Sequence, residues 1–383
     1  MRSSLLLVLP VLLTACGARG HTDRRTLRAP PATTPDAVAV PPPRSVAGDA
    51  GPWHHRRGVF SADGPAARPN ERWRRALGAP ITLPLTTDGT YIYAVSGGTV
   101  HQLTRDGEVR WSAPARAVGP VAPLHGAPAV ATEDGVVLLL DPDTGRHDAA
   151  YVASEPIGTA VPVGAELAWV ESDGTVSSGS SWTYDTGEPG AASGGPVSAG
   201  EVLLYGTQSA RLRAVTPAGL RWSVQLPGPA VGHPTTDASR VLVAYGAGQG
   251  HSGGVAAYAL EDGRELWRWA LSLEPAAPPA LGRLVLVPDL GGQLNALDPD
   301  TGELVWRTPG ESSWSATPAI GGMGAFATEI HGMVVRIDMD DGGLVWRADL
   351  RSAIASSPVL IGDTLVVGLV SGDVVALGPS PAD

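Results

Sequence analysis

Residues 279–306 read PALGRLVLVPDLGGQLNALDPDTGELVW, and this stretch divides into short apolar runs separated by turn sequences. Leu284 to Val287 is a continuous apolar run, which is typical of a strand buried on both faces. The sequence DPDTG at 298–302 indicates a tight turn, because Asp side chains accept hydrogen bonds from nearby backbone N–H groups and Gly adopts positive φ readily. The stretch therefore predicts antiparallel strands joined by tight turns.

The same unit recurs along the chain, marked by a Pro at similar intervals. The small residues Ala276 and Ala277 precede this Pro in the quoted unit and indicate that the innermost strand lies before it. The spacing is between 34 and 45 residues for Pro84, Pro123, Pro162, Pro196, Pro234, Pro279, Pro318 and Pro358. This period is typical of a β-propeller. We predict an all-β fold, an eight-bladed β-propeller of four-stranded antiparallel blades, with seven blades as the alternative if the third unit is an insertion.

A Trp marks the outer strand of most units. It follows the turn Gly by four residues in four of them, for example Gly302 to Trp306. A large ring at one place per blade would wedge between adjacent blades and bury much apolar surface. We interpret these residues as structural, with an aromatic ligand platform as the alternative: Trp73, Trp111, Trp222, Trp267, Trp306 and Trp346. Two units depart from the pattern, with Ala149 in place of the Trp in the second and an irregular sequence around Trp182 in the third.

The last unit, which opens at Pro358, ends before its outer strand. At the other end of the repeats, Arg72 to Arg75 has the sequence of an outer strand with no blade before it. We predict that this N-terminal strand completes the C-terminal blade, which would remove the open sheet edges of the ring. The propeller is thus expected over residues 71–378, followed by a short tail at 379–383.

The first fifteen residues are predicted to be a lipoprotein signal peptide. Arg2 precedes an apolar stretch, Leu5 to Leu13, that is too short to span a membrane. The following Thr14-Ala15-Cys16 resembles the bacterial lipoprotein signal, and Cys16 is the only cysteine in the chain. We therefore predict lipid attachment at Cys16, with an ordinary secretory signal as the alternative. Gly17 after the cysteine favours the outer membrane, facing the periplasm of the bacterial cell envelope.

Between signal and propeller the composition changes twice. Residues 16–51 are rich in Pro, Ala and Arg without periodicity, which predicts a disordered tether. Residues 52–70 contain Trp53 and Phe60 and are expected to pack on the propeller.

Every basic residue is Arg, so Schiff-base chemistry and a P-loop are excluded. The acidic excess of the propeller argues against nucleic-acid binding.

Motifs with possible chemistry are few. The sequence at 250–254, GHSGG, matches G-x-S-x-G, but it lies between two expected strands, so we interpret it as a protruding Gly-rich loop with His251 as a candidate contact. Recurrence of the Asp-rich turns at one place in each unit favours turn formation over calcium binding. No catalytic, metal or cofactor site is predicted. Trp314 and His233, both near inner strands, are candidate ligand or partner contacts, with core packing as the alternative for Trp314.

The repeated LDPDTGELVW pattern, with an S-x-P or T-P opening, resembles the pyrroloquinoline-quinone-type propeller repeat. Two kinds of protein carry it: quinone-dependent dehydrogenases, and non-enzymatic BamB-like outer-membrane assembly lipoproteins. The single cysteine, the shorter chain and the small inner-strand residues favour the second kind. The resemblance implies a non-catalytic, lipid-anchored scaffold with an envelope protein partner, possibly in the outer-membrane assembly machinery. The alternatives are an enzyme using pyrroloquinoline quinone with calcium or another redox enzyme, and a module that binds envelope glycan or a small ligand.

Overall fold

The computed structural model describes residues 58–379, apart from 124–126, 165, 180, 188–189, 191 and 248–251. The predicted lipid attachment at Cys16 and the candidate contact His251 lie outside the described residues, as does Trp53. Within the described residues every regular element is a β-strand.

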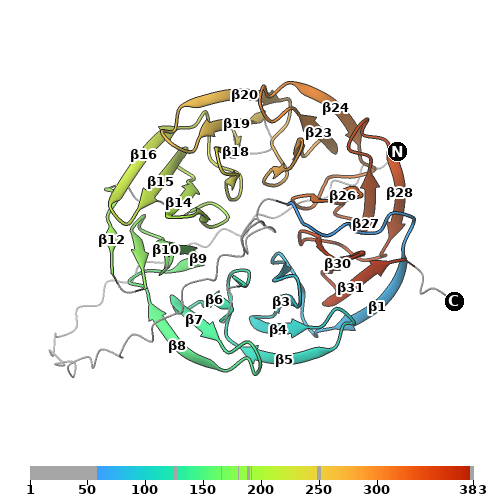
Figure 1. Cartoon of the computed structure of the whole chain (residues 1–383), viewed down its shortest axis with the longest axis horizontal. Coiled ribbons are helices and arrows are strands. Elements are labelled where there is room, and N and C mark those ends of the chain that lie inside the picture. Colours follow the sequence, from blue (N-terminus) through green and yellow to red (C-terminus); the bar gives the residue numbers. More distant parts are fainter. Residues whose placement is uncertain are drawn as a thin grey trace, which may run out of the picture. The chain divides into compact units, whose positions relative to one another are not determined.

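The strands form eight blades around a central axis (Figure 1), in seven four-stranded sheets and one three-stranded sheet. The prediction of an eight-bladed propeller is confirmed, and the third unit is a blade, not an insertion. Blades 1 to 4 comprise, from the inner strand outward, β2 (Thr86–Thr87), β3 (Ile92–Ser96), β4 (Thr99–Leu103) and β5 (Val109–Pro114); β6 (Ala129–Ala131), β7 (Val136–Leu140) and β8 (His147–Val152); β9 (Ile157–Val163), β10 (Glu166–Glu171), β11 (Val176–Ser178) and β12 (Thr183–Tyr184); and β13 (Val197–Ala199), β14 (Val202–Gly206), β15 (Arg211–Thr216) and β16 (Gly219–Gln225).

Blades 5 to 8 follow the same order, and the last of them takes its outer strand from the start of the chain. They comprise β17 (Thr235–Thr236), β18 (Arg240–Gly246), β19 (Gly253–Ala259) and β20 (Glu265–Leu271); β21 (Ala280–Leu281), β22 (Val285–Pro288), β23 (Gln293–Leu297) and β24 (Leu304–Pro309); β25 (Ala319–Gly321), β26 (Gly324–Thr328), β27 (Met333–Ile337) and β28 (Leu344–Asp349); and β29 (Val359–Ile361), β30 (Thr364–Gly368), β31 (Asp373–Gly378) and β1 (Asn70–Ala76).

The innermost strands differ from the sequence prediction in position. In six blades they begin after the marker Pro, as β25 does after Pro318, whereas in blade 3 β9 includes Pro162. The residues before the Pro make only an isolated bridge, such as Trp314 with Glu329. Pro has no N–H to donate, so it interrupts the ladder at this point. In blade 2 the innermost strand is reduced to the single bridge between Ala122 and Ala129.

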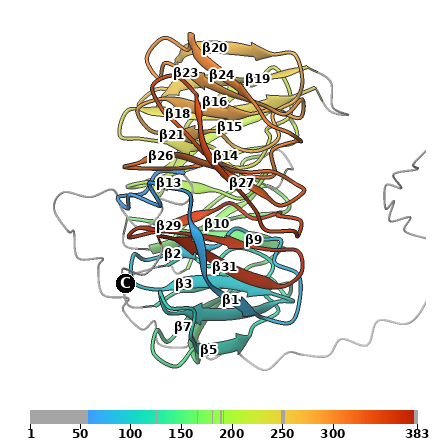
Figure 2. The same cartoon turned by 90° about the vertical axis from the view of Figure 1, so that its right-hand side faces the viewer.

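The ring is closed by β1, which pairs antiparallel with β31 and places Trp73 opposite Ala376. Figure 2 views the ring from its edge and shows β1 beside β31. Arg72 reinforces the seam through an ion pair with Asp363, 3.1 Å long. The predicted completion of the C-terminal blade by an N-terminal strand is therefore confirmed.

This topology gives the ring two faces, face A and face B. Face A carries the turns between second and third strands and the connections from one blade to the next. Face B carries the turns between first and second strands and between third and fourth strands. The core lies between the blades, where large side chains such as Tyr205, Tyr258 and Phe326 are buried. Burial of each contributes roughly 1.5–3 kcal/mol.

Candidate functional site

The outer-strand Trp residues join each blade to the next. In five seams the indole N–H donates to a backbone carbonyl in the face B turn of the following blade. The pairs and their distances are Trp73 to Arg105, 2.7 Å; Trp111 to Pro142, 2.9 Å; Trp222 to Leu260, 3.0 Å; Trp267 to Pro299, 2.9 Å; and Trp306 to Met339, 3.1 Å. Each Trp thus packs between two blades and carries a hydrogen bond across the seam.

The turn Gly beneath each Trp is required by close approach. A Cβ on Gly302 would lie 2.5 Å from the ring of Trp267, and Gly302 has a φ of 73°. Gly145 stands in the same relation to Trp111, with 2.5 Å to the ring and a φ of 70°. The pairing of Trp and Gly in the repeat therefore reflects contact between neighbouring blades, not contact within one blade.

Tyr residues replace the Trp in the two degenerate seams. Ala149 occupies the expected Trp position opposite Leu139, but the ring of Tyr151, two residues later, lies over Gly179, where a Cβ would approach it to 2.6 Å. In the next seam Tyr184 lies near Gly219, with 3.5 Å to a Cβ built there. Sequence reasoning missed both residues, although an aromatic residue two positions along the same strand face was a usable signal.

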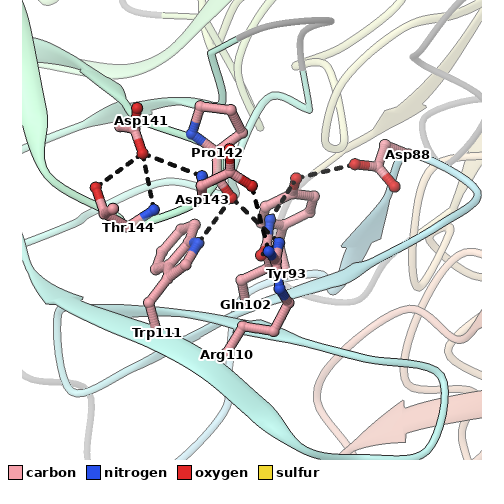
Figure 3. A network of polar contacts seen from close by, with 9 residues as sticks. All are labelled: Asp88, Tyr93, Gln102, Arg110, Trp111, Asp141, Pro142, Asp143 and Thr144. Carbon is pink, nitrogen blue, oxygen red and sulfur yellow. Dashed lines mark hydrogen bonds and ion pairs between the residues drawn. The ribbon is translucent and has the colours of Figure 1, made fainter.

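A polar network crosses the seam between blades 1 and 2 (Figure 3). Arg110 donates to the buried Gln102 Oε1 at 2.7 Å and to Asp143 of the next blade at 3.2 Å. Gln102 in turn donates to the Tyr93 hydroxyl at 3.1 Å, which donates to Asp88 at 2.9 Å. Burial, followed by the nearby Asp88 carboxylate, raises the pKa of Tyr93, which therefore stays neutral at physiological pH.

The Asp-rich turns use their carboxylates within the turn. The Asp141 carboxylate accepts hydrogen bonds from the backbone N–H groups of Asp143 and Thr144 and from the Thr144 hydroxyl. These bonds, with the Thr144 hydroxyl first, lower the pKa of Asp141. Among residues 58–379 as described, no group of three or more His, Cys, Asp or Glu side chains is placed to hold a metal ion.

The seam between blades 7 and 8 has a different acceptor. The Trp346 indole donates to the Pro65 carbonyl at 3.2 Å, and Arg336 donates to the Ala66 carbonyl. A Cβ on Gly64 would lie 2.6 Å from the Phe326 ring. The strap, which we define as residues 58–69, thus takes the place of the third-to-fourth-strand turn that blade 8 lacks.

The strap is also fixed by backbone hydrogen bonds to face B. Gly322 N–H donates to the Ala62 carbonyl at 3.2 Å, and Met323 N–H donates to Asp63 at 3.1 Å. On blade 8, Gly64 N–H donates to the Gly362 carbonyl at 3.1 Å. The strap therefore bridges the first turns of blades 7 and 8.

Trp314 is 3% exposed and lies in the core between blades 6 and 7. Its indole N–H has no hydrogen-bond partner among the described residues. It lines a shallow pocket of about 40 Å³ together with Glu329 and Arg347. The Glu329 carboxylate accepts hydrogen bonds from the backbone of Glu311 and from Ser312, so it organises the connection into blade 7.

His233 is half-buried beside the inner strand of blade 5, with Nδ1 3.0 Å from the Pro234 carbonyl. Because blade 6 separates it from Trp314 on blade 7, the two candidate contacts do not form one site. The structure thus places them in different environments.

A set of exposed aliphatic side chains was not singled out from the sequence. They occupy equivalent second-to-third-strand turns on face A of three consecutive blades: Leu290 at 42% exposure, Ile330 at 39% and Val370 at 37%. The corresponding exposed positions of blades 2, 3 and 4 are Glu133, Ser172 and Gln208. We name the first three residues the aliphatic arc.

The described part of the chain contains no helix long and apolar enough to cross a bilayer. Its fold defines it as an eight-bladed β-propeller. A family model described as "Outer membrane protein assembly factor BamB" matches residues 66–189, 166–278 and 251–381. The chain belongs to this family.

Solved structures share the fold. BamB from Moraxella catarrhalis is 18% identical with a TM-score of 0.66, over 83% of this chain and 99% of that one. The computationally designed Ika8 protein is 12% identical with a TM-score of 0.69, over 79% of this chain and 98% of that one. No curated protein sequence gives a significant match. At these identities the structural likeness defines the fold alone.

Proposed function

We propose that this protein is a non-catalytic, lipid-anchored scaffold of the bacterial cell envelope that holds a protein partner in outer-membrane protein assembly. The observation that carries the proposal is the family match, which extends through the repeats from residue 66 to residue 381. The lipoprotein-like sequence ending at Cys16 supports attachment to the outer membrane on its periplasmic side.

We place the partner contact on the aliphatic arc of face A. Three consecutive blades expose an aliphatic side chain at one equivalent position, where three other blades expose Glu, Ser or Gln. Exposed apolar side chains gathered on neighbouring elements are typical of protein-binding surfaces. The partner is expected to present an apolar surface to blades 6, 7 and 8.

Crosslinking in the envelope of a Gram-negative host, followed by purification, tests this proposal. The native chain should co-purify with outer-membrane assembly components, and the triple variant L290S/I330S/V370S should lose them while retaining its thermal unfolding midpoint. The single variant V152S, which changes an aliphatic residue 76% exposed on another blade, is the matched control. Capture that is equal for all three proteins would exclude the aliphatic arc as the contact.

Two further measurements on the same samples address the anchor and the enzyme alternative. The variant C16S should leave the membrane fraction if Cys16 carries the lipid. A quinone absorbance spectrum with calcium at one equivalent per chain would replace the scaffold proposal with an oxidoreductase. Capture of cell-wall glycan without assembly components would instead support the ligand-binding alternative.

A further inference from the structure

The connection from blade 7 to blade 8 crosses face A between two members of the aliphatic arc. At its start, the Leu350 N–H donates to the Gly332 carbonyl at 3.0 Å, in the turn that carries the arc residue of blade 7. At its other end, the Ala353 carbonyl accepts a hydrogen bond from the Val370 N–H at 2.9 Å. Arg351 therefore lies on a short segment that is fixed to the turns of two neighbouring arc residues.

Arg351 has an uncommon backbone conformation. Its φ is 55°, in the left-handed region that residues other than Gly rarely adopt. Its backbone N–H donates to the Asp349 carboxylate at 2.8 Å, and the residue is exposed. Residues held in such conformations are concentrated at ligand-binding positions.

Arg116 is the counterpart of Arg351 in the connection from blade 1 to blade 2. Each of the two arginines follows the outer-strand Trp of its blade by five residues, and Arg116 has a φ of 51°. The Arg116 guanidinium forms ion pairs with Glu133 and with Asp134, the latter 2.8 Å long, in the turn of the next blade. The charge of Arg116 is thus balanced within the chain.

The corresponding turn of blade 8 places no carboxylate at these two positions. Val370 and Ser371 stand there, directly before the turn Gly, where blade 2 has its two acidic residues. The Asp373 carboxylate that follows is paired with Arg74 at 3.2 Å. Among the described residues, no carboxylate forms an ion pair with the Arg351 guanidinium.

A third charged residue at this position is also paired inside the chain. Glu311, in the connection from blade 6 to blade 7, forms an ion pair with Arg347 of blade 7. Three charged residues stand five positions after an outer-strand Trp, and Arg351 is the one whose charge is not balanced by the described part of the chain. It is also the one that lies between two exposed aliphatic side chains of the arc.

We propose that Arg351 binds a carboxylate of the protein that docks on the aliphatic arc, and that this carboxylate belongs to an Asp or Glu flanked by apolar side chains. A guanidinium forms bidentate, charge-assisted hydrogen bonds with a carboxylate. The exposed Ile330 and Val370 on the two adjoining turns supply the apolar contacts on either side. The inference rests on the proposed docking at the arc and adds the chemistry of the partner's contact segment.

Capture of outer-membrane assembly components by the full, membrane-anchored chain tests the role of the charge. R351G should lower capture on the order of tenfold, and R351K, which keeps the charge without the planar fork, should lie between R351G and the native chain. Because Gly adopts positive φ without strain, R351G should keep or raise the thermal unfolding midpoint, whereas a purely structural role for Arg351 would lower it. R116G is the matched control, since it removes an arginine of the same conformation, and it should capture like the native chain.

A photo-crosslinking residue in place of Ser371, beside Val370 on face A, identifies the partner segment. The adducts should map to a protein segment with Asp or Glu next to apolar residues, and an Arg in place of that acidic residue should restore capture by R351E. Adducts on a segment without a carboxylate, no recovery in the charge swap, or no protein adduct, as expected for a glycan, would overturn the proposal.

The same variants separate this inference from the scaffold function. Equal capture by R351G and the native chain, with loss in L290S/I330S/V370S, would overturn the Arg351 contact and leave the arc as the docking surface. Crosslinking to a carboxylate-bearing protein outside the assembly machinery, lost in R351G, would keep the Arg351 contact and exclude the role in assembly.

Discussion

The indole N–H of Trp346 donates to the backbone carbonyl of Pro65, which lies 281 positions earlier in the chain. In the other Trp seams the acceptor belongs to the next blade's own turn. Blade 8 has no such turn, because its outer strand comes from the N-terminus. The ring therefore closes through two pieces of the N-terminal chain, the strap and β1.

We expect removal of residues 1–76 to destabilise the monomer. The deletion exposes the β31 edge and the Trp346 seam, and an uncovered strand edge pairs readily with other chains. Size-exclusion chromatography with light scattering should show oligomers or aggregates, together with a lower unfolding midpoint. The control deletion of residues 1–57 retains the strap and β1 and should remain monomeric. A stable monomer of residues 77–383 would contradict this account of closure.

Gly302→Ala should destabilise the protein more than Gly89→Ala. Both glycines have positive φ, 73° and 86°, so both substitutions carry the backbone cost of a left-handed residue. The Cβ at position 302 also meets the Trp267 ring, whereas nothing lies within 4 Å of a Cβ at position 89. Denaturant unfolding should show an additional loss of about 1–3 kcal/mol for Gly302→Ala. Equal losses would mean that the Trp seam can relax without cost.

Stability should fall as the pH drops below about 6.5, in part through His101. Burial lowers the pKa of His101 from its ordinary 6.5, so the unfolded chain binds the proton more readily than the folded chain. The stabilisation from the neutral ring is thus present above the unfolded pKa and is lost as the pH falls toward the folded pKa. Urea titrations between pH 8 and pH 5 should show a shallower decline for His101→Gln. Parallel curves for the two proteins would contradict this assignment.

The side chains of the network in Figure 3 should contribute to the free energy of unfolding in a coupled and not an additive way. Gln102→Leu removes the buried acceptor of Arg110 and the donor to Tyr93, at an expected cost of about 1–3 kcal/mol. A double-mutant cycle with Arg110→Met should give a coupling of about 0.5–3 kcal/mol. Additive losses would indicate that water replaces each bond independently.

Tyr151 should stabilise the fold through its ring and not through its hydroxyl. Its ring contacts Trp169 at a centroid distance of 6.2 Å and covers Gly179. Thermal unfolding should show Tyr151→Phe close to the native protein and Tyr151→Ala destabilised by about 3 kcal/mol. A neutral Tyr151→Ala would mean that the second seam is held by other contacts.

The number of blades, the closing strand and the family were readable from the chain because each depends on a local signal that repeats. A Pro, a turn with Asp and Gly, and a Trp at fixed offsets record the period of the blade. The extra strand before the first unit and the strand that the last unit lacks record the closure. The same signals misplaced the innermost strand in most blades, because Pro lacks an N–H and limits the residues before it to an isolated bridge, such as that of Trp314 with Glu329.

The sequence by itself thus determined the architecture of this protein, because each repeat carries its own strand and turn signals and the number of repeats gives the number of blades. The tertiary structure alone decided what fills each seam: Tyr151 over Gly179, Pro65 beneath Trp346, and Gly58 against the inner wall of blades 6 and 7. The contacts of Pro65 and Gly58 join residues far apart in the chain, and no local pattern records them; for Tyr151 the sequence offers an aromatic residue near the expected Trp position but not the glycine that it covers. Their positions follow from the geometry of the closed ring, which brings the first described residues against the last blades.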